Sequence, residues 1–547
     1  MGRDVRQILE EAIRSIGITP PEIELEIPRD EQFGDIATPV AMTLSKTLRK
    51  PPIKIAEDIV KAIREKDIFE SIEIAGPGFI NFTLTTTHLY TELKGLLLER
   101  ERFLRKDIGK GRRILIEFVS ANPTGPLHLG HGRGAAVGAA LSNLLMAAGY
   151  QIEREYYIND AGRQVRILGL SVFARYHQLF GVDIPLPEDG YKGDYIESIA
   201  RQVIDLHGDT YMGNDFIDDT EVFFTDVSFK AMLREIGRDL RDFGILFDTW
   251  QSERELFTEG EVEKSIETLR QRRHIYEKDG ALWFRSTEFG DDKDRVIKKS
   301  DGEYTYFASD IAYHFKKIER GFDEIVNIWG ADHHGYIQRI RAVIRSLGYP
   351  PEHLRVLLVQ MVTLLRAGRP VQMSKRAGEF ITLREVMDEV GADTTKFYFL
   401  TRRPDSHLEF DLEVAKEQSA ENPVFYVQYA NARIHSIFAH AGERGIDASG
   451  FEGIDLSLLS APEEIQIIKK LLTYPMTFEG AVITREPHRI TFYLKELAGL
   501  FHPYYNRYRV VTDDLELSRA RLALCDATRL VLRDGLGILG LSAPERM

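Results

Sequence analysis

The chain has 547 residues, of which 43% are hydrophobic and 29% are charged, and its formal net charge at pH 7 is −14. This is the balance of an ordinary globular protein, and the length predicts roughly three or four domains rather than one hydrophobic core. No apolar run approaches the roughly 20 residues of a membrane span, and the single cysteine, Cys525, excludes an internal disulfide and a multi-cysteine zinc site.

The first predicted unit, residues 1–105, has the pattern of an α+β module. Apolar residues recur at helical spacing over residues 5–16 and 53–66. Strand-like runs follow at residues 71–76 and 78–84, around a Gly-Pro-Gly turn. The opening helix is amphipathic and lacks the pattern of a secretory signal, so we expect a cytoplasmic protein with no membrane partner.

The second predicted unit, residues 106–400, has the pattern of a Rossmann-type α/β core. Short apolar strand runs alternate with longer helical stretches, which is typical of a parallel sheet with right-handed crossovers. The segment 183–280 is polar and rich in helical signal, and we interpret it as a helical insertion. The strand runs are residues 113–119, 151–157, 324–330 and 355–362.

The third predicted unit, residues 401–547, is expected to be an all-α helical bundle. Strand signals vanish from about Glu421 onward, and four long helical runs follow one another. The expected fold is therefore multidomain, with an α+β module, a parallel-sheet core and a C-terminal helical bundle.

The segment from Ser120 to Arg133, SANPTGPLHLGHGR, carries the strongest chemical signal. It follows a predicted strand and contains His128 and His131, with a small-residue helix expected from Gly134. A helix N-terminus binds anions through its N–H groups, and two imidazoles there can donate hydrogen bonds to phosphate oxygens. The glycines of the turn let a nucleotide lie close against the backbone. The implied ligand is a nucleoside triphosphate, held by Pro123, Gly125, His128, Gly130 and His131.

Two other interpretations of this segment stay open at this point. Gly130, Gly132 and Ala135 have the spacing of a loose dinucleotide-binding fingerprint, with Glu153 or Glu155 where a ribose-binding acid is expected. A loop with a purely structural role is the other alternative.

A second segment, AGRPVQMSKRAGEF, favours the triphosphate. It places Met373, Ser374 and Lys375 in a polar loop flanked by glycines, after the apolar run 356–362. A lysine on such a loop can reach triphosphate oxygens that the first loop leaves uncovered.

The two segments together resemble the paired signature motifs of class I aminoacyl-tRNA synthetases, and their sequences are most similar to those of the arginyl-tRNA synthetases. The resemblance extends over separate blocks, from GDIATPVAMTLSK near the N-terminus through YYINDAGRQ and TYFASDIAYH to FYVQYANARIHSI. One position departs from the pattern. The usual Lys-Met-Ser-Lys is here Gln372-Met373-Ser374-Lys375, which leaves Lys375 as the expected working cation.

The resemblance implies an arginine–tRNA ligase. It would activate L-arginine with ATP, bound with Mg²⁺ through its phosphates, and transfer the arginyl group to the 3′ end of tRNA(Arg). His128, His131 and Lys375 are the expected catalytic residues, and Met373 and Ser374 join them at the ATP. A monomer is expected by analogy.

Arginine itself constrains its pocket, because a planar guanidinium with five donors calls for carboxylates, carbonyl acceptors and an aromatic wall. For Asp310 an N-cap of the following helix is the alternative interpretation. By resemblance, the residues that contact arginine are Glu117, Ser120, Asn122, Tyr306, Asp310 and Gln338.

The resemblance assigns tRNA binding to the flanking units, with the anticodon at the C-terminal bundle and the tRNA elbow at the N-terminal module. Aromatic residues beside cations are the useful pattern for reading single-stranded bases. Tyr504, Tyr505, Arg507 and Arg509 supply it, although aromatic residues buried in a bundle give the same pattern. The net charge of −14 argues against RNA binding unless cations gather on one face.

Other functions are weighed against this one. Asp332, His333 and His334 suggest a metal centre or a phosphoesterase, but they lack a second ligand cluster, so no protein-bound metal is predicted. A synthetase for another amino acid, a metabolite nucleotidyltransferase and a catalytically silent tRNA-binding relative are the remaining alternatives. A silent relative is expected to have lost one of the three catalytic residues, and all are present.

Overall fold

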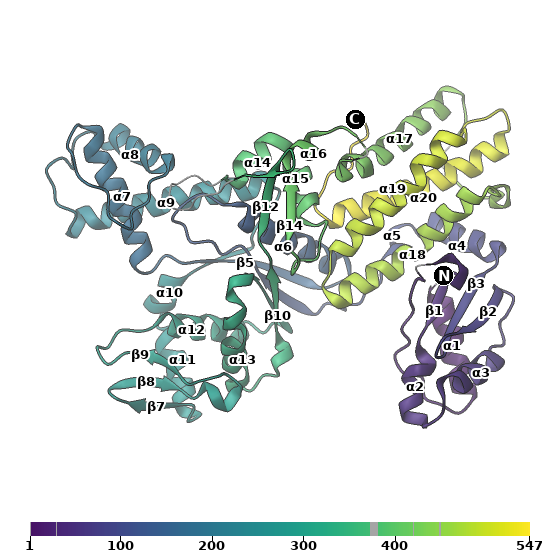
Figure 1. The fold of residues 1–547 in the computed structure, drawn as a ribbon, viewed down its shortest axis with the longest axis horizontal. Helices are drawn as coiled ribbons and strands as arrows, with labels where there is room; N and C mark the ends of the chain where they lie inside the picture. Colours follow the sequence, from purple (N-terminus) through teal and green to yellow (C-terminus); the bar gives the residue numbers. More distant parts are fainter. Residues whose placement is uncertain (1, 29, 372–380, 420, 448–449) are drawn as a thin grey trace. The chain divides into compact units, whose positions relative to one another are not determined.

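The computed structural model describes residues 2–28, 30–371, 381–419, 421–447 and 450–547. Gln372, Met373, Ser374 and Lys375 lie outside the described residues. The chain forms two compact units, one of residues 1–108 with 423–547 and the other of residues 109–422 (Figure 1).

A five-stranded parallel sheet organises the unit of residues 109–422. Its strand order is β11-β10-β4-β5-β6, and every neighbouring pair is parallel. In β4 the apolar residues Ile114, Leu115 and Ile116 are all buried, as expected for a parallel strand covered on both faces. This confirms the predicted Rossmann-type core. The strands are β4 (Arg113–Glu117), β5 (Gln151–Ile158), β6 (Thr249–Ser252), β10 (Glu324–Gly330) and β11 (Leu354–Val359).

Helix α6 (Leu129–Ala147) follows β4 and lies against the sheet. It begins at Leu129, not at Gly134 as the small-residue run predicts, because His128 caps it from the turn. Its glycines allow close packing. A Cβ on Gly138 would lie 2.3 Å from the ring of Phe118, so this position accepts glycine only.

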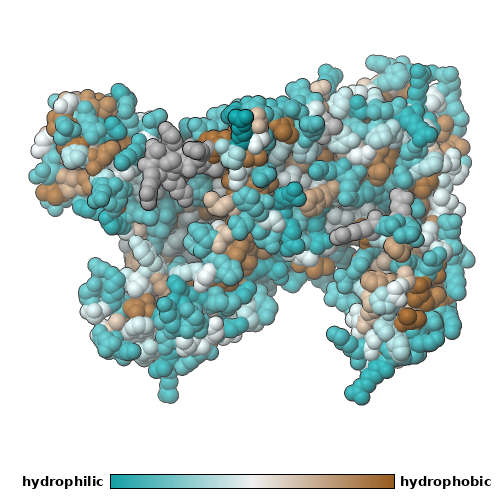
Figure 2. All heavy atoms as spheres, in the orientation of Figure 1, coloured by the Kyte–Doolittle hydropathy of each residue, from teal (hydrophilic) through white to brown (hydrophobic). Residues whose placement is uncertain are grey.

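The predicted helical insertion contains a strand as well as helices. The helices α7 (Arg163–Leu179), α8 (Asp194–His207) and α9 (Asp218–Asp242) form a lobe with a core of its own around Phe173, Tyr176 and Phe224. Figure 2 shows brown patches of hydrophobic side chains over the part of this lobe formed by α7 and α8. Strand β6, which lies inside the predicted insertion, pairs with β5 as an edge of the main sheet.

The rest of this unit surrounds the sheet. Two small sheets have the orders β7-β8-β9 and β13-β12-β14. The predicted strand run 355–362 is broken at Gln360, so that β11 and β12 belong to different sheets. The remaining elements are α10 (Glu253–Thr258), α11 (Glu261–Gln271), β7 (Ile275–Lys278), β8 (Ala281–Phe284), β9 (Arg295–Lys298), α12 (Tyr306–Glu319), α13 (Ile337–Ser346), β12 (Val362–Arg366), β13 (Arg369–Pro370), α14 (Leu383–Val390), α15 (Ala392–Phe399), β14 (Leu408–Asp411) and α16 (Leu412–Lys416).

The other unit joins the two ends of the chain. Its N-terminal part is the expected α+β module, with an antiparallel sheet of order β1-β3-β2. Its C-terminal part is the expected helical bundle. The elements are α1 (Gly2–Ser15), β1 (Ile36–Thr38), α2 (Val40–Leu48), α3 (Pro52–Ala62), β2 (Phe69–Ala75), β3 (Phe79–Leu84), α4 (Thr86–Glu99), α5 (Glu101–Leu104), α17 (Pro423–Glu443), α18 (Pro462–Thr484), α19 (His488–Arg507) and α20 (Leu515–Ile538).

Ion pairs fasten the two parts of this unit to each other. Arg105 lies 2.6 Å from Asp534, whose other carboxylate oxygen accepts a 2.6 Å hydrogen bond from the hydroxyl of Tyr474. Lys469 of the bundle lies 2.8 Å from Asp35 of the N-terminal module. Across the described ranges, no helix has both the length and the apolar character that a membrane span requires.

Candidate active site

The two histidines of the predicted nucleotide turn lie face to face at the start of α6. Nδ1 of His128 accepts from the backbone N–H groups of Gly130 and His131, at 3.1 and 3.3 Å. Nδ1 of His131 accepts from the N–H of His128 at 3.4 Å. The rings are stacked, with centroids 3.6 Å apart and an interplanar angle of 15°. Because each Nδ1 is an acceptor, both neutral rings carry their proton on Nε2.

This pair sits at the positive end of a 19-residue helix, where an anion is favoured. The loop that leaves β4 leads to the imidazoles, and the carboxyl edge of a parallel sheet is where ligands bind in this architecture. The arrangement can therefore donate Nε2–H hydrogen bonds to phosphate oxygens.

The turn before the histidines is held from the helical lobe. The hydroxyl of Tyr195 donates to the carbonyl of Thr124 at 2.9 Å. A Cβ on Gly125 would lie 3.2 Å from that hydroxyl oxygen. Pro123 is buried, so the backbone of the turn has little freedom.

Arg133, one turn into α6, ties this helix to two other segments. Its guanidinium donates to the carbonyls of Gln360 and Ser406, both at 2.8 Å, and to that of Arg403 at 2.9 Å. The side chain is fully buried, and this desolvation lowers the pKa of Arg133 to about 10. The three carbonyls compensate the buried charge through charge-assisted hydrogen bonds.

The chain that follows the second predicted motif returns to the histidine turn. Thr382 forms an isolated antiparallel bridge with His128, and the N–H of Leu383 donates to the carbonyl of Leu127 at 2.7 Å. Thr382 also caps α14 through a capping box with Glu385. Lys375 precedes Thr382 by seven residues in the sequence.

Glu117, the first predicted arginine ligand, is part of a buried network. Its Oε2 accepts from Nζ of Lys317 at 2.6 Å, and Lys317 also donates to Oδ1 of Asn327 at 3.0 Å. Its Oε1 accepts from the hydroxyl of Ser120 at 3.0 Å. The charge of Glu117 is thus balanced inside the protein.

Ser120 and Asn122 lie on the loop that leaves β4. Ser120 has a positive φ of 41° and follows Val119 with a φ of 68°, a backbone conformation that costs free energy for side chains other than glycine. The hydroxyl of Ser120 accepts from the N–H of Tyr157 at 3.1 Å. Asn122 is exposed and donates to Oε1 of Gln164 at 2.8 Å.

Asp310 lies inside α12, so the N-cap interpretation is wrong. The helix starts at Tyr306 after Thr305, and Asp310 is in its second turn. The hydroxyl of Tyr336 donates to its carboxylate. Burial, with the nearby negative charges of Glu253 and Glu117, raises the pKa of Asp310 to about 7, although the hydrogen bond from Tyr336 opposes this shift.

Two predicted arginine ligands, Tyr306 and Gln338, lie at the surface. Tyr306, the first residue of α12, is 68% exposed, and a Cβ on Gly162 would lie 3.8 Å from its hydroxyl oxygen. Gln338, in the first turn of α13, is also exposed. Both side chains can therefore meet a ligand that enters from solvent.

The sequence analysis missed a second carboxylate and its aromatic neighbours. Glu253, the first residue of α10, is buried and accepts from the hydroxyl of Ser309 at 2.7 Å. Burial raises its pKa. The ring of Tyr157 stacks on Tyr313 at 4.3 Å, and its pKa is raised by burial and by the charges of Glu253 and Asp310. Glu253 and Asp310 thus lie near each other, and Tyr157 lies near both.

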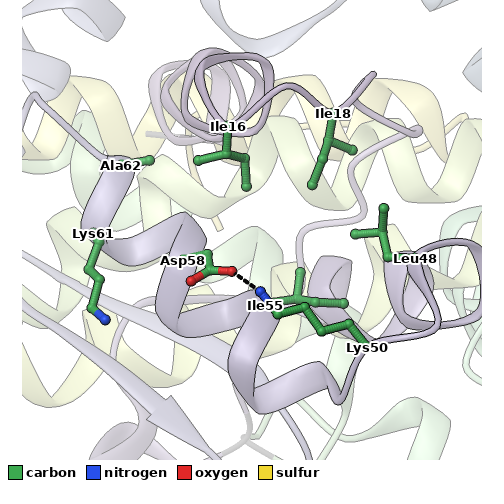
Figure 3. A pocket seen from close by; sticks show the side chains of 8 residues that line it. All are labelled: Ile16, Ile18, Leu48, Lys50, Ile55, Asp58, Lys61 and Ala62. Atoms are coloured by element: carbon green, nitrogen blue, oxygen red, sulfur yellow. Dashed lines mark hydrogen bonds and ion pairs between the residues drawn. The ribbon is translucent and has the colours of Figure 1, made fainter.

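A separate cavity of 630 Å³ lies in the N-terminal module (Figure 3). Apolar side chains line it from opposite sides, with Ile16 and Ile18 facing Ile55. Lys50 and Asp58 form an ion pair at its edge, and Lys61 stands beside them. Apolar sides with cations at the edge suit a flat base next to a phosphate.

The predicted RNA-contact residues of the bundle divide by exposure. Tyr504 is fully buried and points toward Glu464 of α18, so its ring is part of the core. Tyr505 is half-buried, and the guanidinium of Arg433 lies 4.7 Å from its ring centre and 4.5 Å from that of Tyr429. Arg507 is exposed and pairs with Glu463, and Arg509 is also exposed.

Comparison with known proteins gives one consistent result. Residues 3–84 match the model of the arginyl-tRNA synthetase N-terminal domain, residues 92–405 that of the class I (R) tRNA synthetase catalytic domain, and residues 427–547 that of the DALR anticodon binding domain. An arginine–tRNA ligase of Citrifermentans bemidjiense is 51% identical over 96% of this chain and 95% of the relative. One of Syntrophotalea carbinolica is 48% identical over the full length of both. The structure of Thermus thermophilus arginyl-tRNA synthetase has the same fold, with a TM-score of 0.78, 23% identity and full coverage of both chains.

Proposed function

The chain belongs to the class I arginine–tRNA ligases, and from this premise we propose which of its residues carry the reaction. The enzyme uses ATP to join L-arginine to tRNA(Arg). In the first step the carboxylate of arginine attacks the α-phosphorus of MgATP and displaces pyrophosphate. In the second, a ribose hydroxyl at the 3′ end of the tRNA attacks the arginyl-adenylate and releases AMP.

His128 and His131 hold the phosphates from one side. Their shared arrangement, with each Nδ1 bonded to backbone, fixes both Nε2–H groups as donors. Such donors act where negative charge develops on the transferred phosphorus, and they need no reorganisation during the reaction. The Nδ1 hydrogen bonds at the start of α6 are the observation that carries this proposal.

Lys375 supplies positive charge from the other side, with Met373 and Ser374 beside it. The short sequence separation between Lys375 and Thr382 supports this role, because Thr382 pairs with His128. Magnesium arrives as part of the substrate MgATP and is bound mainly through phosphates and water.

Arginine binds with its guanidinium between Asp310 and Glu253. Two carboxylates accept the forked donors, and Tyr157 and Tyr336 form the wall. Tyr306 and Gln338 close the exposed side. Because its charge is already balanced by Lys317, Glu117 orients the hydroxyl of Ser120, which with Asn122 meets the amino acid backbone.

Transfer RNA is bound by the unit of residues 1–108 and 423–547. The N-terminal cavity of Figure 3 takes a base of the tRNA elbow, and the exposed groups Tyr505, Arg507 and Arg509 meet the anticodon. The matched anticodon-binding domain supports the second assignment. The enzyme acts as a monomer. It works in the cytoplasm, where both ATP and tRNA are present.

The deciding experiment measures tRNA charging by the full chain with each of the twenty amino acids, at saturating ATP and tRNA. We expect arginine alone to be charged at a high rate. Charging with lysine at a comparable kcat/KM would contradict the two-carboxylate pocket, since lysine cannot form the forked contact.

A further inference from the structure

Three side chains that can bind a metal ion converge in the N-terminal module. Asp4 lies in the first turn of α1, and His88 and Glu92 lie one turn apart on α4. One ligand atom of each lies within 4.8 Å of those of the other two. Among the described residues, this is the one group of three or more His, Cys, Asp or Glu side chains placed in this way. Asp4 and Glu92 also line a cavity of 180 Å³, to which α18 contributes Leu472 and Met476.

The imidazole of His88 supplies a second observation. Its side chain is 10% exposed, and no described residue gives its buried Nε2 a hydrogen-bond partner. Oδ2 of Asp4 lies 3.6 Å from this nitrogen, which is beyond hydrogen-bond distance. A buried ring nitrogen without a partner costs free energy, and a bound ion removes that cost. Burial lowers the pKa of His88, so the ring is neutral at pH 7, which is the form that binds metals.

The spacing of the three groups suits a tetrahedral ion. His88 and Glu92 are four residues apart, so α4 presents both side chains on one face. In a zinc site with bonds of about 2.0–2.2 Å, neighbouring ligand atoms are about 3.4 Å apart. The distance of 3.6 Å between Nε2 of His88 and Oδ2 of Asp4 is already close to this value. The side chain of Asp4 is 45% exposed, so a change of rotamer can adjust its position.

The charges around the cavity also favour a cation at these three residues. Glu479 of α18 lies 3.2 Å from Arg6 and 3.1 Å from Lys106, so it engages two cations that line the cavity. The one ion-pair partner that the described residues give Asp4 is His88. Two ionised carboxylates beside a neutral imidazole are balanced by a divalent cation.

We propose that Asp4, His88 and Glu92 bind a Zn²⁺ ion, which fastens the first turn of α1 to α4. One imidazole and two carboxylates are ligands that Zn²⁺ accepts, whereas Mg²⁺ prefers oxygen ligands and water. Solvent in the cavity supplies the fourth ligand. The ion stabilises the N-terminal module and takes no part in joining arginine to tRNA, so the inference goes beyond the proposed function. The sequence analysis did not predict this site, because Asp4 and His88 lie far apart in the chain.

The test uses the full chain after a chelator has removed bound metal. Zn²⁺ is titrated in competition with a chromophoric zinc indicator, in the presence of excess Mg²⁺, and the titration gives Kd. The variants are His88→Gln and Asp4→Asn. His440→Gln is the matched control, because His440 lies 3.5 Å from Glu443 at an exposed position of α17. Melting temperatures without added metal show which variants are folded.

The unaltered chain should bind Zn²⁺ with a Kd of about 1 μM or below. We expect His88→Gln to raise this Kd about 100-fold and Asp4→Asn to raise it about tenfold, whereas His440→Gln should change it less than about twofold. Zinc should slow the hydrogen exchange of backbone amides in α1, and this effect should be lost in His88→Gln. X-ray absorption at the zinc edge, with one equivalent of Zn²⁺, should show one imidazole among oxygen ligands.

An equal Kd for His88→Gln and the unaltered chain would overturn the proposal, since the ion would then bind elsewhere. A Kd above about 100 μM for the unaltered chain, unchanged exchange in α1, or a signal from two imidazoles would overturn it as well. If His88→Gln does not fold, Asp4→Asn decides, because the exposed side chain of Asp4 can be replaced without disturbing the core. All measurements are made without ATP, arginine or tRNA, so their outcome is independent of the proposed function.

Discussion

Nζ of Lys317 lies 2.6 Å from Oε2 of Glu117, and the two side chains are 0% and 7% exposed. Lys317 also lies 4.0 Å from the ring centre of Tyr313, which stacks on Tyr157, the tyrosine near Glu253 and Asp310. A cation of the protein thus neutralises the carboxylate at the end of β4. In the proposed arginine site, Asp310 and Glu253 are then the two carboxyl groups that can bind a guanidinium.

Removing one partner of this pair should destabilise the unit of residues 109–422. Lys317→Met leaves the charge of Glu117 buried and unpaired, which costs about 3–5 kcal/mol of unfolding free energy. Urea unfolding of the full chain measures the loss. The double variant Glu117→Gln/Lys317→Met should recover part of it, and Lys316→Met, at a partly exposed position paired with Glu259, should change stability little. Equal stability of the two lysine variants would show that the pair is not coupled to folding.

Arginine use should depend on pH through Asp310. Burial raises the pKa of this carboxyl to about 7, so it becomes neutral as the pH falls below 7 and loses its attraction for the guanidinium. We expect kcat/KM for arginine to fall about tenfold per pH unit below that value. Asp310→Asn should lower kcat/KM by about 100-fold at pH 8 and flatten the profile. Asp332→Asn, at an exposed position, is the control, and a flat profile of the unaltered enzyme from pH 6 to 8 would refute the assignment.

His128 caps α6 and is proposed to donate a hydrogen bond to phosphate, and two variants should separate these roles. Asparagine is a good N-cap, so His128→Asn should keep the helix start while losing the Nε2–H donor. We expect a melting temperature close to that of the unaltered enzyme, with adenylate formation slowed about 100-fold or more. His128→Ala loses both tasks and should be less stable by about 1 kcal/mol. Single-turnover pyrophosphate release with tRNA present measures the first step, and a normal rate for His128→Asn would remove the phosphate role.

Lys375→Ala should slow adenylate formation about a thousandfold with a smaller change in arginine affinity, because the lysine is expected to act on the transition state. Gln372→Ala is the matched control in the same segment and should change the rate less than about threefold. Pyrophosphate exchange in the presence of tRNA measures both. An unchanged exchange rate for Lys375→Ala rules the role out.

Neighbouring tyrosines of α19 should respond differently to truncation. Tyr505→Ala should raise KM for tRNA about fivefold through loss of a stacking surface, with melting temperature nearly unchanged. Tyr504→Ala empties a fully buried position and should cost about 3–5 kcal/mol of stability. Thermal melting and charging kinetics separate the two. If Tyr505→Ala leaves the KM for tRNA unchanged, Tyr505 does not contact the anticodon.

The order of units and the sheet core could be predicted from sequence, because apolar strand runs such as Arg113–Val119 carry strong local patterns. The start of α6 could not, since Gly130 and Gly132 have poor helix propensity and the helix depends on the capping side chain of His128. Strand β6 is four residues long with three polar side chains, and only its pairing with β5 makes it a strand.

The proposed arginine site could not be predicted from sequence for a different reason. Glu117 is a clear anomaly in an apolar strand, but its partner Lys317 is 200 residues away in sequence. Glu253 stands in a polar stretch that gives no signal of burial. What makes these charges functional or structural is long-range packing, which local periodicity does not contain.

Arg133 recognises backbone carbonyls rather than side chains, and this has a consequence for how the protein can vary. Positions 360, 403 and 406 supply only their main-chain oxygens to Arg133, so this contact does not restrict which side chains occupy them. Arg133 has no such freedom, because lysine lacks the planar fork that serves three acceptors at once. Among relatives of this chain, an invariant arginine facing three variable positions is the pattern to look for.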